Sequence, residues 1–306
     1  MKPLIVITGP TACGKTPAAV ALAKMINGEV VSADSMQIYR GMDIGTAKPT
    51  RAEMAGIPHH MIDVADPTED YSVARYVTEA AACVEDIRAR GKLPILVGGT
   101  GLYIDSLLSG RDFAPRGTME DDRPYGMDVW QALQKIDPEA AARLHPNDRK
   151  RVTRALEVYR LTGQTITEHN RMTQTLPPRY RALKIALTAE ERPALYARIE
   201  GRVDAMVAAG LQGEVEALLQ AGLTPRHTAM QAIGYQEMAE VLRGDTTLDE
   251  AITMIKQESR RYAKRQLSWL RRDPTVNWIH WDREPDFPKA VQRSTEFCHA
   301  AGIIGR

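Results

Sequence analysis

The stretch Gly9–Thr16 constrains the fold of this chain more than any other part of the sequence. It reads GPTACGKT, which matches G-x-x-x-x-G-K-S/T, and it stands between the apolar run Leu4–Ile7 and the alanine-rich run Ala18–Ala23. A strand, a glycine-bearing turn and a helix in this order form a phosphate-binding loop, in which backbone N–H groups and the helix N-terminus face an anion. Lys15 is suited to neutralise a terminal phosphate, and the Thr16 hydroxyl is suited to hold Mg²⁺. The motif predicts an α/β core that binds a phosphorylated small molecule, without identifying that molecule.

Composition excludes some other classes of protein. The chain has 306 residues, which suggests roughly two domains. Its formal net charge is only +1, so any nucleic-acid partner must be inferred from local charge clusters. The three cysteines, Cys13, Cys83 and Cys298, have no metal-ligand spacing and predict a reducing, cytoplasmic setting. The sequence has no apolar run of the length that a membrane helix needs, and its first apolar run continues into the phosphate loop, so we expect no membrane partner and no signal peptide.

Two further segments should meet the phosphate loop at one edge of a parallel sheet. Asp34 follows the apolar pair Val30–Val31, and Gly98–Gly101, which contains Thr100, follows the unbroken apolar run Leu93–Val97. Ligands of open α/β sheets bind at the carboxyl ends of the strands. Asp34 therefore either faces the bound ligand or caps the next turn. The glycine turn either allows close approach of a ligand to the backbone, with Thr100 as a hydrogen-bonding group, or is a plain strand-to-helix connection.

Composition changes at Arg111, and we expect an insertion there. Residues 111–180 are interpreted as a mostly helical inserted domain, and residues 1–110 and 181–306 as the α/β core with C-terminal helices. Within the insertion, Arg143–Arg154 carries a net charge of +4, and Arg151 and Arg154 share a helix face.

The long helix expected over Leu248–Arg272 is strongly basic near its end. From Lys256 onward it carries a net charge of +6, with Tyr262 and Trp269 among the cations. This pattern indicates either a groove for an RNA backbone or a solvated basic face, and the interleaved aromatic residues favour the first. Upstream, Arg198 and Arg202 lie four residues apart in the predicted helix Arg192–Ala209.

Seven stretches in order along nearly the whole chain carry a family resemblance. They are Gly9–Thr16; Asp34–Gln37 with Tyr39; Asp43–Pro49; Pro58–His60; Gly98–Tyr103; Asn147–Asp148 with Arg151 and Arg154–Glu157; and Tyr262–Gln266 with Trp269–Arg271. In these stretches the chain resembles the bacterial tRNA dimethylallyltransferases. The resemblance implies a P-loop NTPase-like parallel sheet flanked by helices, with an inserted helical domain. It also implies transfer of a dimethylallyl group from dimethylallyl diphosphate to the exocyclic amine of an adenosine beside the tRNA anticodon, with release of diphosphate.

The resemblance further implies roles for individual residues. Asp34 would be the general base, and Thr100 would orient the amine or the departing oxygen. Lys15, Arg202 and a Mg²⁺ ion on Thr16 would stabilise the leaving diphosphate, which makes ionisation of the allylic carbon easier. The implied diphosphate-binding residues are Gly9, Pro10, Thr11, Ala12, Cys13, Gly14, Lys15, Thr16 and Arg202.

The implied partner is the tRNA anticodon stem-loop, with the target base flipped into the site. The implied contacts are Asp34, Ser35, Met36, Gln37, Thr100, Arg123, Lys150, Arg151, Val152, Thr153, Arg154, Gln231, Ala232, Ile233, Gly234, Tyr235, Gln236, Lys264, Arg265, Gln266, Leu267, Ser268, Trp269, Leu270 and Arg271. The segment after Gly110 is shorter than is usual in the family. The family has an RNA-contacting arginine in this segment, and its counterpart here is Arg123 or, alternatively, Arg116. We expect a monomer.

Two other functions would account for part of the sequence. A P-loop small-molecule kinase would explain Gly9–Thr16 and Asp34 but not the basic helix, and it predicts ATP turnover without RNA. A non-catalytic RNA-binding module would explain the basic helix but not the phosphate loop, and its RNA binding would survive loss of Asp34.

Overall fold

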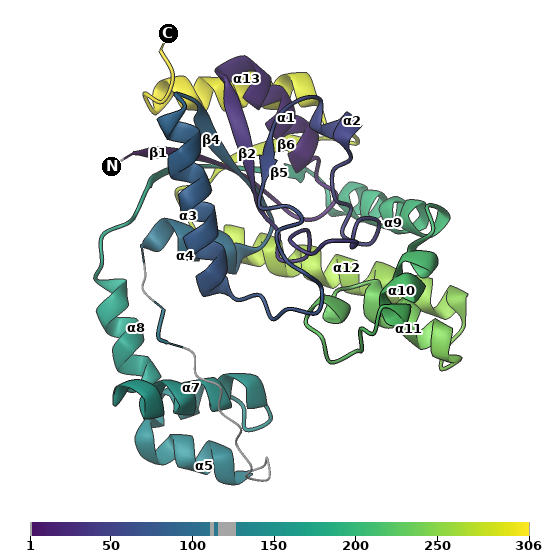
Figure 1. Ribbon diagram of the computed structural model, residues 1–306. Helices are drawn as coiled ribbons and strands as arrows, with labels where there is room; N and C mark the ends of the chain where they lie inside the picture. The colour runs from purple at the N-terminus through teal and green to yellow at the C-terminus, as the bar shows by residue number, and fades with distance from the viewer. Residues whose placement is uncertain (1, 111–112, 116–126, 306) are drawn as a thin grey trace. The chain divides into compact units, whose positions relative to one another are not determined.

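A six-stranded sheet organises the larger part of the chain (Figure 1). The structure is a computed structural model that describes residues 2–110, 113–115 and 127–305. The strands lie in the order β3-β2-β4-β1-β5-β6, and every neighbouring pair is parallel. Their bounds are β1 Pro3–Thr8, β2 Gly28–Ala33, β3 His59–His60, β4 Leu93–Gly98, β5 Arg181–Ala189 and β6 Asn277–Trp281. The prediction of a parallel sheet in an α/β fold is confirmed.

The central strands are apolar on both faces because helices cover both sides of the sheet. In β1, the residues Leu4–Ile7 are at most 1% exposed. Ile5 and Ile7 pack in one core with α1 and α13, and the alternate residues Leu4 and Val6 are buried on the opposite face. The helices of this part of the chain are α1 Lys15–Ile26, α2 Arg51–Met54, α3 Val73–Ala89, α4 Gly101–Ser109, α9 Arg192–Ala208, α10 Leu211–Gln220, α11 Tyr235–Arg243, α12 Leu248–Leu270 and α13 Phe287–Ala300, with a short 3₁₀ turn at Ala229–Gln231.

The C-terminal helices form a group of their own beside the sheet. Helix α9 contacts α10 and α12, and α11 contacts α10 and α12. Figure 1 shows these four helices together, in green shades, apart from α1 and α13. The 23-residue helix α12 begins with a capping box, in which the Thr247 side chain accepts from the Glu250 N–H and Glu250 accepts from the Thr247 N–H.

Local sequence signals predict several of these elements closely. Apolar residues that recur at three- and four-residue steps predict a helix over Tyr71–Arg90, and this helix is α3, which begins after the N-cap Ser72. The sequence also predicts a short strand in Pro58–Val64, but only His59 and His60 pair with β2. Strand β6 has no counterpart among the sequence predictions; it forms because residues 277–281 add to the free edge of β5.

Contacts divide the chain into two compact units, Met1–Leu108 with Tyr180–Arg306, and Ser109–Arg179. The described helices of the second unit are α5 Met127–Ile136, α6 Pro138–Arg143, α7 Arg149–Thr162 and α8 Ile166–Gln174. A small core around Leu133, Val152 and Leu156 holds them together. Asp137, which is 3% exposed, caps α6 through the Ala140 N–H and also accepts from the Thr167 N–H and hydroxyl. The second unit is therefore helical and has a core of its own.

Candidate functional site

The loop between β1 and α1 has the backbone geometry of a phosphate-binding loop. Gly9 has a φ of +141°, and a Cβ atom there would lie 2.3 Å from the Leu187 carbonyl oxygen and 2.7 Å from Cys13 Sγ. Gly14, with a φ of +88°, begins α1. Both glycines are needed because side chains would clash or strain the backbone at these positions. The backbone of the loop Gly9–Thr16 therefore curves at the N-terminus of α1, and a helix N-terminus stabilises a bound anion.

Two cations line this loop. Lys15 Nζ donates to the carbonyl oxygens of Gly9 (3.1 Å) and Pro10 (2.7 Å), which holds the ammonium inside the curve of the loop. Arg202, on α9, donates to the Thr11 hydroxyl at 3.3 Å. Burial lowers the pKa of both Lys15 and Arg202. Two cations that lose hydration with few anionic partners form an environment suited to an anionic ligand.

Asp34 caps a turn and also faces the phosphate loop. Its Oδ1 accepts from the N–H groups of Met36 (2.9 Å) and Gln37 (3.3 Å). Asp34 lines the same cavity as Lys15 and Arg202. The sequence left open whether Asp34 faces the ligand or caps the next turn. Both can hold, because one carboxylate oxygen caps the turn while the residue borders the cavity. Its role as a base stays a prediction.

Thr100 acts on the segment that carries Asp34. Its Oγ1 accepts from the Ser35 N–H at 3.1 Å and lies 3.4 Å from Ser35 Oγ, and its own N–H donates to the Ala33 carbonyl oxygen at 3.2 Å. Thr100 is not among the residues that line the two cavities described below. Its neighbour Tyr262 does line them, and burial raises the pKa of the Tyr262 phenol to about 12. Thr100 thus fixes the backbone beside Asp34.

Gln266 connects two ligand-facing turns. Its Oε1 accepts from the Thr11 N–H at 2.8 Å, and its Nε2 donates to the Gly99 carbonyl oxygen at 2.9 Å. The side chain comes from near the C-terminal end of α12, and the residue is 6% exposed. The sequence places Gln266 with the tRNA contacts, whereas the structure gives it the task of joining the phosphate loop to the glycine turn after β4.

Two cavities meet beside Asp34. The larger, of about 1050 Å³, extends from the phosphate loop to α9 and the loop after β2, and the smaller has a volume of about 300 Å³. The residues that line both are Thr11, Asp34, Thr46, Arg202, Met206 and Tyr262. Lys15 lines only the larger cavity and Arg202 lines both, while the smaller one has the apolar side chains Ile199, Val203 and Ile255 in its wall. One arrangement of residues can therefore hold an anion and an apolar group next to a carboxylate.

Arg198 also belongs to the larger cavity. Its Nε donates to the Ala12 carbonyl oxygen at 3.1 Å, and its guanidinium forms an ion pair with Glu284. The spacing of Arg198 and Arg202 identified both residues, but only Arg202 was assigned to the diphosphate. Glu284, from the segment between β6 and α13, and Phe287, the first residue of α13, line the same cavity and have no signal in the local sequence.

A Mg²⁺ ion fits the residues at Thr16. The Thr16 hydroxyl lines the larger cavity next to Lys15. Within the described part of the chain, no cluster of three or more His, Cys, Asp or Glu side chains could hold a metal. A single hydroxyl is suited to Mg²⁺, which takes most of its ligands from substrate phosphates and water.

Some of the predicted tRNA contacts are exposed and others are not. The exposed side chains in this set are Lys150, Arg151, Gln231, Gln236, Lys264, Arg265, Ser268 and Arg271. Buried residues are Val152, Ala232, Gly234, Tyr235, Gln266 and Leu270. For these buried positions a contact with tRNA stays a prediction, and three of them border the cavities: Ala232 and Gly234 line the smaller one and Gln266 lines the larger one. On a basic amphipathic helix, the residues of the inner face belong to the same sequence motif as the cations, but they are buried whereas the cations are exposed.

Arg154, whose contact with tRNA stays a prediction, makes several contacts within its own unit. Its guanidinium donates to the carbonyl oxygens of Ala114 (2.6 Å) and Pro115 (3.0 Å) and pairs with Glu157 at 2.7 Å. These contacts tie α7 to the preceding segment of the same unit. Arg123 and Arg116 lie outside the described residues.

No helix in the described part of the chain combines the length and apolar character that a membrane crossing requires.

Comparisons with known proteins agree with this geometry. The family model described as IPP transferase matches residues 37–273, and the model described as Isopentenyl transferase matches residues 2–69. The chain is 47% identical to the tRNA dimethylallyltransferase of Pelotomaculum thermopropionicum, with 96% of this chain and 97% of the relative covered. The relative of the same name from Halalkalibacterium halodurans is also 47% identical, with 96% of each chain covered.

Solved structures are similar over the same length. The tRNA isopentenylpyrophosphate transferase of Bacillus halodurans superposes with a TM-score of 0.75 at 45% identity, covering 99% of this chain and 96% of that one. A eukaryotic dimethylallyltransferase solved while acting on tRNA gives a TM-score of 0.85 at 32% identity, covering 99% of this chain and 80% of that one.

Proposed function

This chain belongs to the IPP transferase family, and we propose that it transfers a dimethylallyl group from dimethylallyl diphosphate to the exocyclic amine of an adenosine next to the anticodon of tRNA. The observation that carries the proposal is the shared cavity wall: Asp34, Lys15 and Arg202 border one space, so an acceptor for the amine proton and two cations for the diphosphate face the place where the two substrates meet. We further propose that the protein acts in the cytoplasm as a monomer.

The phosphate loop holds the leaving group in this proposal. The backbone N–H groups of the loop, the N-terminus of α1, Lys15 and Arg202 bind the diphosphate oxygens. Mg²⁺, held by the Thr16 hydroxyl, supplies additional positive charge to the diphosphate when bound. The C–O bond to the diphosphate breaks and its electron pair leaves with the oxygen, so cations placed where negative charge develops lower the barrier.

Asp34 acts on the adenine amine in this proposal. The adenine amine forms a C–N bond with the allylic carbon, and its proton passes to the Asp34 carboxylate. A neutral exocyclic amine is a weak nucleophile, so a proton acceptor held next to the amine assists the reaction. Thr100 keeps this geometry by fixing Ser35, the residue after Asp34.

The exposed cations provide the surface for RNA. On α12, Lys264, Arg265 and Arg271 are exposed, and in the second unit Lys150 and Arg151 are exposed. Arg265 also lines the smaller cavity, next to Ser35 and Met36. Phosphate contacts from such side chains position an anticodon loop, and the target base enters the cavity after leaving the stack.

The test is a product assay with a substitution that keeps the turn intact. The protein is incubated with Mg²⁺, dimethylallyl diphosphate and unmodified tRNA, and the nucleosides are analysed by mass. Asp34→Asn retains Oδ1, which accepts the two N–H groups, but removes the base, and we expect a rate about 10²–10⁴-fold lower with tRNA binding retained. Asp66→Asn is the matched control, because Asp66 caps an exposed turn at Thr68 away from the cavities and should leave the rate unchanged.

Two results would overturn the proposal. Wild-type protein that forms no dimethylallyl-adenosine but releases phosphate from ATP would support the kinase alternative. Wild-type protein that binds tRNA without forming any product would support the RNA-binding alternative.

A further inference from the structure

The loop at residues 43–48, here called the cavity loop, forms a wall of both cavities without any regular secondary structure of its own. Asp43, Ile44, Thr46, Ala47 and Lys48 line the larger cavity, and Gly45 and Thr46 line the smaller one. The loop shares both cavity walls with Asp34 and with Arg202 and Met206 of α9, so a shift of the loop would change the shape of the space beside Asp34. The question is what holds such a loop in place.

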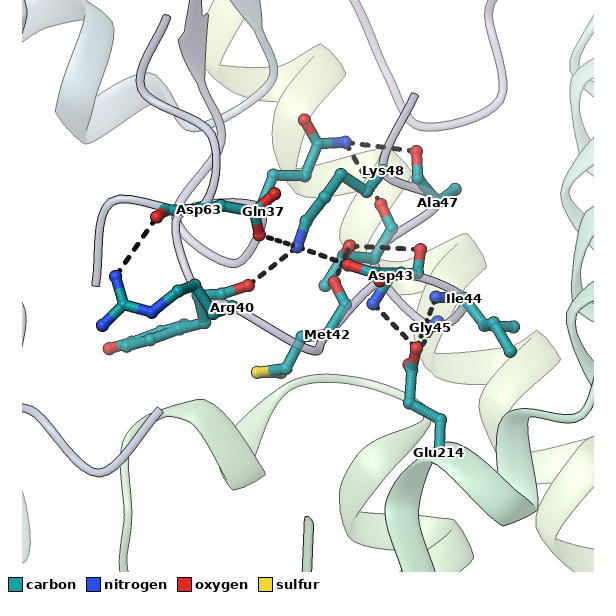
Figure 2. A network of polar contacts seen from close by, with 12 residues as sticks. Gln37, Arg40, Met42, Asp43, Ile44, Gly45, Ala47, Lys48, Asp63 and Glu214 are labelled. Carbon is teal, nitrogen blue, oxygen red and sulfur yellow. Dashed lines mark hydrogen bonds and ion pairs between the residues drawn. The ribbon is translucent and has the colours of Figure 1, made fainter. Parts of the chain in front are cut away.

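Glu214 provides the main attachment. This residue of α10 accepts three consecutive backbone N–H groups, with Oε2 at 2.8 Å from both Asp43 N and Ile44 N and Oε1 at 3.1 Å from Gly45 N. The Tyr235 hydroxyl donates to the same Oε1 at 2.6 Å. Figure 2 shows the Glu214 carboxylate pointing into the curve made by Asp43, Ile44 and Gly45. Each carboxylate oxygen therefore accepts two donors.

Tyr235 and Gly45 complete this attachment. Tyr235 is fully buried, and a Cβ atom on Gly45 would lie 2.5 Å from its ring and 2.8 Å from Leu211 Cδ1. Burial and the Glu214 carboxylate raise the pKa of Tyr235, so the phenol stays protonated and remains a donor. Leu211 and Glu214 are on α10 and Tyr235 begins α11, so the two helices hold the loop from one side.

The other side of the cavity loop is held by Lys48 and Gln37. Lys48 Nζ lies 2.6 Å from Asp43 Oδ1 and 2.5 Å from Asp63 Oδ1, and it donates to the Tyr39 carbonyl oxygen at 2.8 Å. Gln37 Nε2 donates to the carbonyl oxygens of Thr46 and Ala47, both at 3.2 Å. Figure 2 shows these contacts on the opposite side of the loop from Glu214. They attach the loop to Gln37, Tyr39 and Asp63, whereas Glu214 attaches it to α10.

We propose that Glu214 is a positioning residue for prenyl transfer, which holds the cavity loop where the transferred group and the adenine meet Asp34. The inference rests on the proposed function. Glu214 does not line either cavity, so it acts through the loop and not on the substrates. Its carboxylate is suited to this task because an anion satisfies three N–H groups that no strand or helix engages.

Glu214→Gln is the informative substitution. Because each oxygen accepts two donors, an amide in either orientation directs its NH₂ group at two other donors and leaves them unpaired. Glu216→Gln is the matched control: it is the same change on the same helix, at an exposed residue whose side chain accepts from Gln220 at 3.3 Å. Tyr235→Phe removes one donor and leaves the three N–H contacts, so its effect should be intermediate.

The measurement separates positioning from general loss of structure. We expect Glu214→Gln to lower kcat for prenyl transfer about 10- to 100-fold, while the inhibition constant of inorganic pyrophosphate with Mg²⁺ changes less than twofold, because the phosphate loop is untouched. Glu216→Gln should match the wild type in both. An unchanged kcat in Glu214→Gln would overturn the inference, and so would a parallel loss of pyrophosphate binding, since this would indicate general damage to the site.

Amide hydrogen exchange provides a readout that does not depend on activity. Exchange at residues 43–45 should be faster in Glu214→Gln than in wild-type protein or Glu216→Gln, and equal exchange in all three would overturn the inference. If wild-type protein forms no prenylated product, the proposed function fails, and the exchange result still shows whether Glu214 holds the loop.

Discussion

The phosphate loop and the cavity loop border the same space but are held in different ways. The phosphate loop is shaped by its own residues, since glycines at 9 and 14 allow its backbone angles and Lys15 fills its curve, and Gln266 and Arg198 attach the loop so formed to α12 and α9. The cavity loop depends on Glu214, which is 171 residues away from Asp43. The first loop has a motif that can be recognised in a sequence, whereas the second becomes a defined structure only when α10 and α11 are in place. Damage to one loop should therefore leave the function of the other intact.

The largest effect is expected from Gly9→Ala. A Cβ atom there would lie 2.3 Å from a backbone oxygen of β5, at a φ that other residues rarely adopt, so the loop must move. We expect pyrophosphate affinity to fall at least 100-fold by calorimetry and the free energy of unfolding to fall by about 3 kcal/mol. Gly41→Ala is the control, because its Cβ would meet no atom within 4 Å, and the cost is only the strain of its φ of +73°, about 1–2 kcal/mol. Normal pyrophosphate binding by Gly9→Ala would show that the loop is not held by its own backbone geometry.

A smaller and more selective effect is expected from Gly45→Ala. The added Cβ would press on the Tyr235 ring and move the cavity loop away from Glu214. We expect kcat for prenyl transfer to fall about tenfold, which corresponds to roughly 1.4 kcal/mol of barrier, with pyrophosphate affinity unchanged. Gly213→Ala on α10, where a Cβ meets no atom within 4 Å, should leave both quantities unchanged. Equal losses of turnover and pyrophosphate binding in Gly45→Ala would mean that the two loops are not independent.

A substitution of Glu29, at the start of β2, is expected to affect the two loops least. Its carboxylate is 1% exposed and is held by Arg90, Lys92 and His60, and hydrogen bonds from these groups, chiefly from Arg90, keep its pKa well below the usual range. A depressed folded pKa stabilises the protein above the pKa of the unfolded chain, about 4.3, and this stability is lost as the pH falls. Glu29→Gln should therefore lower the free energy of unfolding by about 2 kcal/mol at pH 7, and the difference from wild type should shrink progressively as the pH falls below about 4, as measured in urea. A pH-independent difference would contradict the assignment of this stability to the charged carboxylate.

The elements that sequence could predict are those with local causes. The apolar runs of β1 and β4, the periodic face of α3 and the phosphate-loop motif each follow from residues close together in the chain. The parallel sheet follows from them, because such unbroken apolar strands need cover on both faces. Asp34 and Thr100 could be placed at one sheet edge for the same reason.

The features that sequence missed have causes far apart in the chain. Gln266 and Tyr235 belong to motifs with exposed cations and amides, and only packing shows that Gln266 reaches Gly99, 167 residues away, and that Tyr235 reaches Glu214. Nothing around Glu214 distinguishes it from an ordinary helix-surface glutamate such as Glu216. Burial on one face of an amphipathic helix can be estimated from periodicity, but the partner of a buried polar group cannot.

The sheet order also has a consequence for synthesis on the ribosome. Strand β1 lies between β4 and β5, and the whole unit Ser109–Arg179 is translated between these two partners. At about 5–20 residues per second, synthesis of residues 99–180 takes roughly 4–16 seconds, and for this time after β4 is made the apolar strand Leu4–Ile7 waits for its second neighbour. During that interval its edge can pair with another nascent chain, whereas the helical unit can form its local contacts at once. The length of the inserted unit therefore determines the time during which the incomplete sheet needs protection from aggregation.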